Sequence, residues 1–164
     1  MFSLTRKSEY ALIALTYLGQ RRQNDEKPAS ARQIAETFDM PIALLMNILK
    51  ELCQARLVNS TRGMHGGYEL AVEPRHVRLL EIVTAIEGPV QFTQCSNSLP
   101  ILGRNCSISK KGCPISRPVR RLQKRFNSFL EAITLENILA DFDGDDEDGK
   151  KVEPAGSRRS GKYG

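Results

Sequence analysis

The chain has 164 residues, of which 40% are hydrophobic and 26% charged, and it contains no tryptophan. This composition is typical of one globular domain, or of a small domain with an added oligomerisation segment, and it excludes a large multidomain enzyme. The formal charge of +5 is unevenly distributed, because residues 1–140 hold 19 bases against 12 acids while residues 141–164 hold five against seven. This excess of basic residues within residues 1–140 favours a polyanionic partner, either nucleic acid or an anionic membrane.

The sequence contains no run of 18 or more apolar residues that could span a membrane, and its N-terminus lacks a secretory pattern. We therefore expect a cytoplasmic protein with no membrane partner. In that reducing compartment, the four cysteines are expected to be thiols or metal ligands rather than disulfides.

Three helices are predicted in the first third of the chain. Apolar residues at helical spacing indicate a first helix from Thr5 to about Gln20, followed by a polar turn over residues 24–28. Ser30 is a suitable N-cap for a short second helix, which the sequence at residues 39–41 should end. A third helix then follows after a tight turn.

The third predicted helix, from about Pro41 to Gln54, has two distinct faces. Its apolar side chains follow the spacing i, i+3, i+4, i+7 and form one stripe: Leu45, Ile48, Leu49 and Leu52. The opposite face carries small, amide and cationic side chains: Ala43, Asn47, Lys50 and Gln54. Amides can hydrogen-bond adenine edges and lysine can reach guanine or phosphate, so this face suits a DNA major groove. An ordinary solvated face has the same composition.

A glycine-rich hairpin is predicted next. Leu57–Val58 and Tyr68–Leu70 read as short strands around a segment that contains Arg62 and three glycines. Three helices followed by such a hairpin are the order of a winged helix-turn-helix, in which the wing delivers a cation to the minor groove or the backbone. A plain tight turn is the alternative, and the glycines do not match a phosphate-binding Walker loop.

A fourth helix is predicted from about Arg78 to Glu87, and a long one from Pro118 to about Leu139. Apolar residues of the long helix are spaced 3, 4, 3, 4 and form a seam: Val119, Leu122, Phe126, Phe129 and Ile133. Such a seam is typical of helix pairing, so we expect a dimerisation helix, with packing onto its own domain as the alternative. Residues 141–164 have no apolar period and are expected to form a disordered tail.

Three cysteines lie between these two helices in the pattern Cys95-x10-Cys106-x6-Cys113. Their segment is rich in Ser, Asn, Gly and Pro, and a metal centre bound by thiolates would fix such an irregular backbone. Structural zinc sites favour closely paired cysteines, so the wide spacing favours an iron–sulfur cluster. A fourth ligand must then come from another residue type or from another subunit. Cys53 stands apart and is predicted to be a small buried side chain.

Two motifs and these late cysteines resemble the Rrf family of bacterial transcription regulators, the group that includes IscR and NsrR. The motifs are Leu4-Thr5-x4-Tyr10-Ala11 and Arg62-Gly63-x2-Gly66-Gly67-Tyr68-x-Leu70, and the resemblance covers about residues 1–140. It implies a homodimeric winged-helix regulator that binds double-stranded DNA at a palindromic operator, with an iron–sulfur cluster that sets DNA affinity.

The resemblance also implies site residues. The positions matching the family's DNA contacts are Ala43, Asn47, Lys50 and Arg62. In NsrR-like relatives, a carboxylate near the start of the first helix of the opposite subunit completes the cluster, and the matching position is Glu9. The alternative for Glu9 is a solvated acid favoured by the helix dipole.

The chain departs from the family pattern in two ways. Ser116 stands where IscR-like members have a histidine after the third cysteine, and the cysteine spacing is wider than in those members. Both [2Fe-2S] and [4Fe-4S] clusters therefore stay open.

These features together predict a mainly α fold with a small β-wing, in four parts. They are a winged helix-turn-helix DNA-binding domain over 1–88, a cysteine-rich cluster-binding loop over 89–116, a dimerisation helix over 117–140 and a tail over 141–164.

The predicted function is a non-enzymatic regulator, acting as a repressor, that senses redox conditions, nitric oxide or iron–sulfur status and takes no small-molecule substrate. We find no nucleophile–base pair or cofactor fingerprint in the sequence. The alternatives are a zinc- or disulfide-based redox-responsive regulator and an iron–sulfur redox protein.

Overall fold

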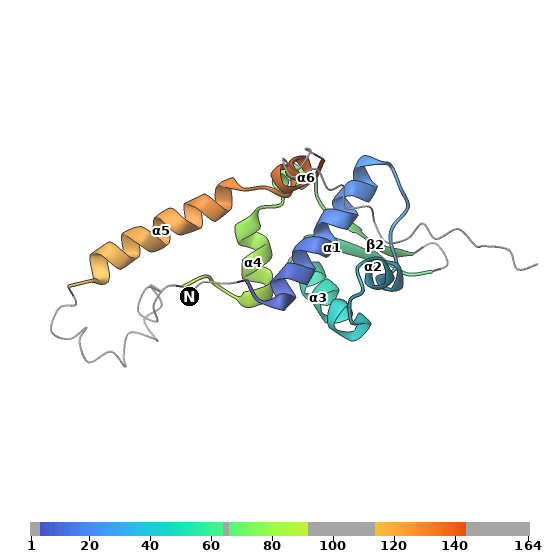
Figure 1. Cartoon of the computed structure of the whole chain (residues 1–164), viewed down its shortest axis with the longest axis horizontal. Helices are drawn as coiled ribbons and strands as arrows, with labels where there is room; N and C mark the ends of the chain where they lie inside the picture. Colours follow the sequence, from blue (N-terminus) through green and yellow to red (C-terminus); the bar gives the residue numbers. More distant parts are fainter. Residues whose placement is uncertain (1–3, 64–65, 92–113, 144–164) are drawn as a thin grey trace, which may run out of the picture.

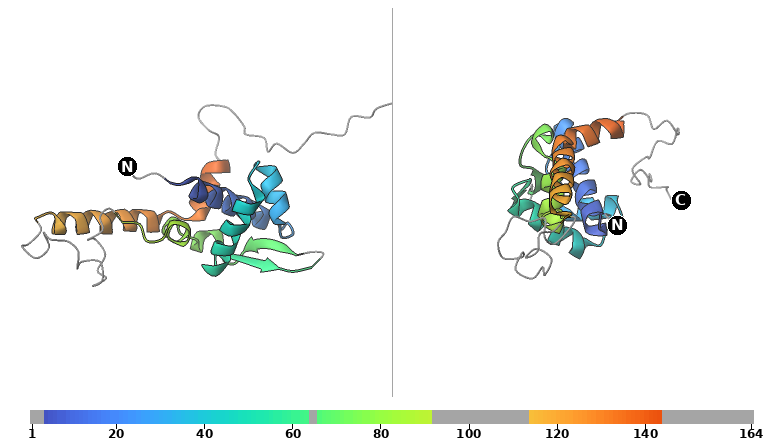
Figure 2. Two further views of the ribbon diagram at one scale, coloured as in Figure 1. Left: turned by 90° about the horizontal axis from the view of Figure 1, so that it is seen from below. Right: turned by 90° about the vertical axis from the view of Figure 1, so that its left-hand side faces the viewer.

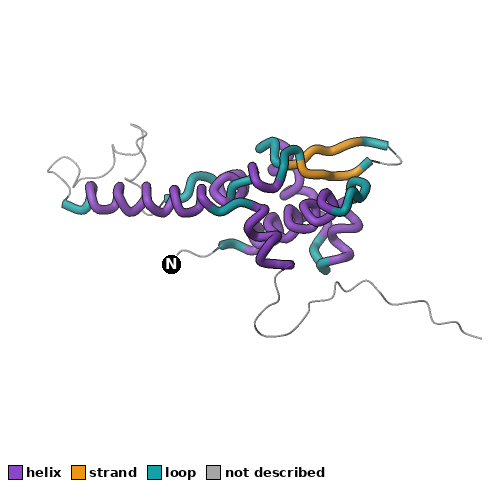
Figure 3. The backbone as a smooth tube through the Cα atoms, turned by 90° about the horizontal axis from the view of Figure 1, so that it is seen from above, coloured by secondary structure: helices purple, strands orange, loops and turns teal. Residues whose placement is uncertain are grey.

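The computed structural model describes residues 4–63, 66–91 and 114–143. Its elements, in chain order, are α1 (Arg6–Gln23), α2 (Ala31–Thr37), α3 (Ile42–Gln54), β1 (Val58–Thr61), β2 (Gly67–Leu70), the 3-10 turn η1 (Pro74–His76), α4 (Leu79–Glu87), α5 (Ser116–Ala132) and α6 (Leu135–Asp143). α1 lies at the centre of a helical body, and α5 extends away from it (Figure 1). The β1–β2 hairpin projects on the side opposite α5 (Figures 2 and 3).

The helix-turn-helix forms as the sequence predicts. Ser30 caps α2 reciprocally with Gln33: the Gln33 backbone N–H donates to Ser30 Oγ at 3.1 Å, and the Ser30 N–H donates to Gln33 Oε1 at 2.8 Å. Asp39, with φ of 51°, turns the chain between α2 and α3. The four apolar residues of the α3 stripe, Leu45, Ile48, Leu49 and Leu52, are completely buried. The predicted stripe is therefore confirmed as the core-facing side of α3.

The wing is a two-stranded antiparallel sheet in which Val58 pairs with Leu70 and Thr61 with Gly67. It is anchored by a bridge between Ala29 and Tyr68, whose backbone groups exchange hydrogen bonds of 3.0 and 2.7 Å. A Cβ on Gly67 would lie 2.7 Å from the Ala29 carbonyl oxygen, so this close approach requires glycine. The first strand was predicted to end at Val58, but it continues to Thr61 because residues 59–61 pair with β2.

α6 completes the core of the N-terminal domain. α1 packs against α3, α4, α6 and β2, and α6 adds the buried side chains of Leu135 and Leu139. A Cβ on Gly19 of α1 would lie 2.8 Å from Leu139 Cδ1, so the absence of a side chain there lets α6 approach closely. α6 therefore belongs to the same packed unit as the helix-turn-helix.

The prediction of one long helix from Pro118 to Leu139 is wrong. The chain is extended at Ile133 and Thr134, where Leu79 N–H donates to Ile133 O at 2.9 Å and Leu135 N–H donates to Val77 O at 2.8 Å. Thr134 directly precedes α6, and its hydroxyl accepts a hydrogen bond from the Asn137 N–H at 3.3 Å. Ile133 therefore lies outside α5, and backbone pairing with residues 77–79 replaces the helical hydrogen bonds.

The predicted tail begins too early, because residues 141–143 are the last turn of α6. The rest of that tail, 144–164, lies outside the described residues. Among the described residues, no helix combines the length and apolar character that a membrane span requires.

Candidate nucleic-acid interface and ligand site

The exposed face of α3 presents the predicted DNA-reading side chains together. Ala43, Asn47 and Lys50 are all exposed, on the side of the helix opposite the buried stripe. Met46 lies among them with 52% of its surface exposed, one turn from exposed Ile42. Sequence reasoning overlooked these two apolar residues, although their positions outside the stripe already placed them on the open side. α3 therefore offers amide, cationic and apolar groups on one face.

Arg62 lies just past the end of the first wing strand, next to glycines that allow a tight turn. Arg62 is exposed directly after β1, and Gly63 follows with φ of 116°, a backbone conformation that favours glycine. Gly66 N–H donates to Gly63 O at 3.0 Å, and a Cβ on Gly66 would lie 2.2 Å from the Thr61 carbonyl oxygen. The glycines therefore build the tight turn that leaves the Arg62 guanidinium available to a partner.

Glu9 lies in the first turn of α1, next to a polar junction built around the buried side chain of Ser8. Thr5 caps the helix, with the Ser8 N–H 3.4 Å from its hydroxyl, and Ser8 is completely buried. The Ser8 hydroxyl donates to Glu87 Oε1 at 2.6 Å, and the Thr5 hydroxyl donates to the same carboxylate. These hydrogen bonds, that from Ser8 first, lower the pKa of Glu87. The start of α1 is thus fastened to the last residue of α4.

The chain that leaves α4 towards the cysteines is held from two sides. Glu87 is bound by α1, and the Val90 carbonyl oxygen accepts a 2.8 Å hydrogen bond from the Gln123 amide of α5. Gly88, with φ of 81°, turns the chain between these contacts. This short stretch therefore connects the helical body around α1 to both α5 and the cysteine segment.

Cys95, Cys106 and Cys113 lie outside the described residues, so the structure describes Glu9 alone of the predicted cluster ligands. The Glu9 side chain is 48% exposed, and its contact with the Arg6 guanidinium is long, at 3.4 Å. An exposed, weakly paired carboxylate is chemically suited to serve as a metal ligand. Within the described ranges, no group of three or more His, Cys, Asp or Glu side chains is arranged to hold a metal.

Cys53, the fourth cysteine, is a half-buried free thiol on α3. Burial raises the pKa of this thiol, and a hydrogen bond with Ser60 opposes the shift to a smaller extent. It packs against the hydrophobic core but is only partly buried, whereas a small buried side chain was predicted.

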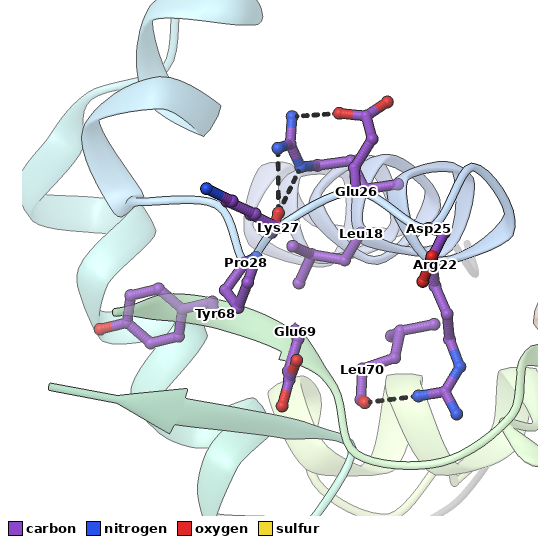
Figure 4. Close-up of a pocket in the computed structure, with 10 residues that line it drawn as sticks. Leu18, Arg22, Asp25, Glu26, Lys27, Pro28, Tyr68, Glu69 and Leu70 are labelled. Carbon is purple, nitrogen blue, oxygen red and sulfur yellow. Dashed lines mark hydrogen bonds and ion pairs between the residues drawn. The ribbon is translucent and has the colours of Figure 1, made fainter. Parts of the chain in front are cut away.

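A pocket of about 140 Å³ lies between the end of α1, the following loop and β2 (Figure 4). The Arg21 guanidinium donates to Lys27 O at 2.9 and 3.1 Å and contacts Glu26 at 2.8 Å. Arg22 donates to Leu70 O at 3.0 Å and pairs with Glu73. These hydrogen bonds and ion pairs hold the loop and the wing against α1, so the charged residues that line the pocket stabilise the fold.

A family model matches this fold and its motifs. The Rrf2 model, described as an iron-dependent transcriptional regulator, matches residues 4–141. The chain belongs to the Rrf2 family. The resemblance read from the sequence is therefore confirmed.

Individual members of the Rrf2 family agree with this assignment. An HTH-type transcriptional regulator of Synechocystis, slr0846, is 34% identical over 138 residues, which cover 84% of this chain and 88% of that protein. The structure of CymR, the global cysteine regulator of B. subtilis, matches with a TM-score of 0.64 and 25% identity over 85% of this chain and 98% of CymR. IscR of T. potens matches with a TM-score of 0.61 and 28% identity over 85% of this chain and 88% of IscR.

The predicted fold class is confirmed: a mostly helical winged-helix protein with a small two-stranded sheet. As a member of the Rrf2 family, the chain is a DNA-binding transcriptional regulator and not an enzyme.

Proposed function

We propose that this Rrf2-family regulator binds a palindromic operator as a homodimeric repressor, with affinity set by an iron–sulfur cluster. The proposed ligands are Cys95, Cys106, Cys113 and, from the opposite subunit, Glu9. The observation that carries the DNA-binding part is the division of α3 into a fully buried apolar stripe and an exposed polar face.

DNA recognition would use α3 and the wing. Asn47 and Lys50 can reach base edges in the major groove, and Ala43 is small enough to allow close approach. Arg62 would bind the minor groove or the phosphate backbone beside it.

Pairing of subunits would use α5. Leu122 and Phe129 lie on its predicted seam and are 53% and 60% exposed, although Leu130 of the same helix is buried by the body. A second copy of α5 would cover this apolar surface. A two-fold dimer also presents two copies of α3 to a palindrome.

The sensing part rests on Glu9 and its neighbourhood. Glu9 offers an exposed carboxylate on a turn that is fastened to Glu87, eight residues before Cys95. An iron–sulfur cluster supplies a group that reacts with oxidants and nitric oxide, and a carboxylate binds iron less strongly than thiolate does. We expect the signal to be redox state, nitric oxide or iron–sulfur status.

The experiment compares wild-type protein with Glu9→Ala after anaerobic purification. Iron, acid-labile sulfide, the absorption spectrum and affinity for DNA selected by the wild type are measured on each. We expect iron and sulfide in the wild type, and an altered spectrum with changed DNA affinity in Glu9→Ala. Glu136→Ala is the matched control, because Glu136 is also an exposed acid in the first turn of a helix. The thermal stability of both proteins is measured as well, and an unchanged spectrum, stability and DNA affinity in Glu9→Ala would contradict the ligand role.

A second candidate is a regulator whose cysteines form a disulfide or bind zinc. Similarity to CymR, which is named a cysteine regulator, favours it. Zinc without sulfide, or a reversible disulfide in protein that carries no iron or sulfide after anaerobic purification, would support this candidate against the cluster.

A further inference from the structure

Three consecutive side chains in the first turn of α1, those of Lys7, Ser8 and Glu9, lie in three different environments. Lys7 Nζ lies 2.8 Å from both carboxylate oxygens of Glu51 on α3. Ser8 is buried against Glu87 at the end of α4, and Glu9 is exposed. Successive helix residues are rotated by about 100°, so one rigid turn connects the recognition helix, the approach to the cysteine segment and the proposed ligand.

The Lys7–Glu51 pair is more sheltered than an ordinary surface salt bridge. The two side chains are 33% and 31% exposed, and they join residues 44 positions apart in the sequence. Glu51 Oε2 is buried, and the Lys7 ammonium 2.8 Å away compensates its charge; no other described group donates a hydrogen bond to this oxygen. Removing one partner of such a pair costs more than breaking an exposed pair, because a sheltered charge is left uncompensated.

Glu51 is well placed to set the position of the DNA-reading face. It follows Lys50 directly, and it lies one turn after Asn47 on α3. A displacement of Glu51 by its partner on α1 would therefore move both of these side chains relative to a DNA groove. Base-edge hydrogen bonds lose strength with small misplacements, so a modest shift is sufficient to change affinity.

We propose that Lys7 and Glu51 are positioning residues that transmit the state of the Glu9 site to the recognition helix. This inference rests on the proposed function, since it requires that Glu9 is a ligand. Ligation of Glu9 would hold the first turn of α1 in one position. Because Ser8 and Lys7 belong to that turn, α3 would be held with it, and release of Glu9 would free both.

The test uses the ratio of two dissociation constants for one DNA duplex, selected from a random library with wild-type protein. One constant is measured on anaerobically reconstituted protein and the other after removal of iron by a chelator. A ratio cancels the direct effect of a changed charge on DNA binding. We expect the wild-type ratio to differ from one by about fivefold or more, as is common for coupled sites.

Lys7→Met and Glu51→Gln should each bring this ratio close to one while leaving iron and sulfide contents unchanged. The exchanged pair, Lys7→Glu with Glu51→Lys, should restore at least half of the wild-type ratio. Arg22→Met is the matched control, because it breaks the ion pair of α1 with Glu73 at the opposite end of the helix. That control should keep the wild-type ratio.

Hydrogen exchange of the α3 amides provides a readout that does not depend on DNA. Iron removal should increase exchange around Glu51 in the wild type and leave it unchanged in Lys7→Met. A wild-type ratio in Lys7→Met with normal iron content would overturn the coupling alone. Failure of the exchanged pair to restore the ratio would also overturn it, because the single variants would then act by general loosening. A wild-type ratio of one would overturn the proposed cluster dependence together with the coupling.

Discussion

α3 and α5 are both amphipathic helices, and they use their apolar faces differently. The stripe of α3 is completely buried within the chain, against α1, α4 and the wing. On α5, Leu130 is buried, whereas Leu122 and Phe129 are exposed on a helix that extends away from the body (Figure 1). The polar faces differ as well, because α3 exposes an amide and a lysine among small and apolar groups, and α5 exposes a dense run of arginine and lysine.

This difference shows which surface of each helix is exposed and able to bind a partner. α3 is held by its own chain, so its outward face is free to recognise another molecule with a fixed geometry. α5 keeps apolar surface that water solvates poorly, so its partner has to be apolar, and a second α5 meets this requirement. Mutations on the two helices should therefore affect different properties.

The largest expected effect is on the stripe of α3. Leu49→Ala removes a fully buried side chain and should lower the free energy of unfolding by about 2–5 kcal/mol, since a cavity is left in the core. Met46→Ala, on the exposed face of the same helix, should change it by less than about 0.5 kcal/mol. Urea unfolding monitored by circular dichroism measures both, and equal losses would contradict the assignment of the two faces.

On α5, removal of apolar side chains should change association rather than folding. Leu122→Ser with Phe129→Ser should weaken the dimer by about 3 kcal/mol or more, which is a hundredfold or greater rise in its dissociation constant. Sedimentation equilibrium measures this constant. The control, Arg120→Ser with Lys124→Ser, alters the opposite face of α5 and should leave the dimer intact. A stable dimer in the apolar double variant would show that the α5 seam does not pair the subunits.

A smaller effect, on DNA affinity, should distinguish the role of α3 in DNA binding from that of the wing. Asn47→Ala should cost about 1–3 kcal/mol in affinity for the selected duplex and relax preference at one base pair, because it removes a base contact. Arg62→Ala should weaken binding to all sequences and lower the salt slope by about one, as expected for a phosphate contact. Fluorescence anisotropy at several salt concentrations distinguishes the two patterns. Arg75→Ala, in η1, serves as the control for loss of a positive charge.

The smallest effect concerns Glu87, at the junction between the body and the chain leading to α5. Its pKa is lowered in the folded protein, so it stabilises the fold above the usual glutamate pKa of about 4.3. This contribution should decline as the pH falls below that value and vanish below the lowered pKa. Because the group is exposed and screened, we expect less than about 1 kcal/mol. Melting temperatures of wild type and Glu87→Gln should converge between pH 6 and pH 3, and a constant gap would contradict this origin.

Local patterns were sufficient to predict the helix-turn-helix and the wing. The capping box of Ser30, the periodic stripe of α3 and the glycines around Arg62 are signals contained within a few neighbouring residues. The grouping of Ala43, Asn47 and Lys50 on one face followed directly from helical periodicity.

Contacts between distant segments could not be read in this way. The apolar spacing of α5 continues through Ile133 with no proline or glycine, and the break arises from backbone pairing with residues 77–79. In the sequence, Lys7 and Glu51 cannot be distinguished from ordinary surface charges. They form an ion pair because α1 packs on α3. Leu139 similarly belongs to the core through its fit against Gly19.

The most direct measurement is selection of DNA from a random library by the full chain at near-physiological salt, followed by sedimentation of the complex. We expect enrichment of an inverted repeat whose half-sites are separated by about one helical turn, 10–10.5 base pairs, or a multiple of it, bound by two copies of the chain. Enrichment of a single asymmetric site bound by one copy, or no enrichment at all, would contradict the assignment of α3 to recognition and α5 to pairing.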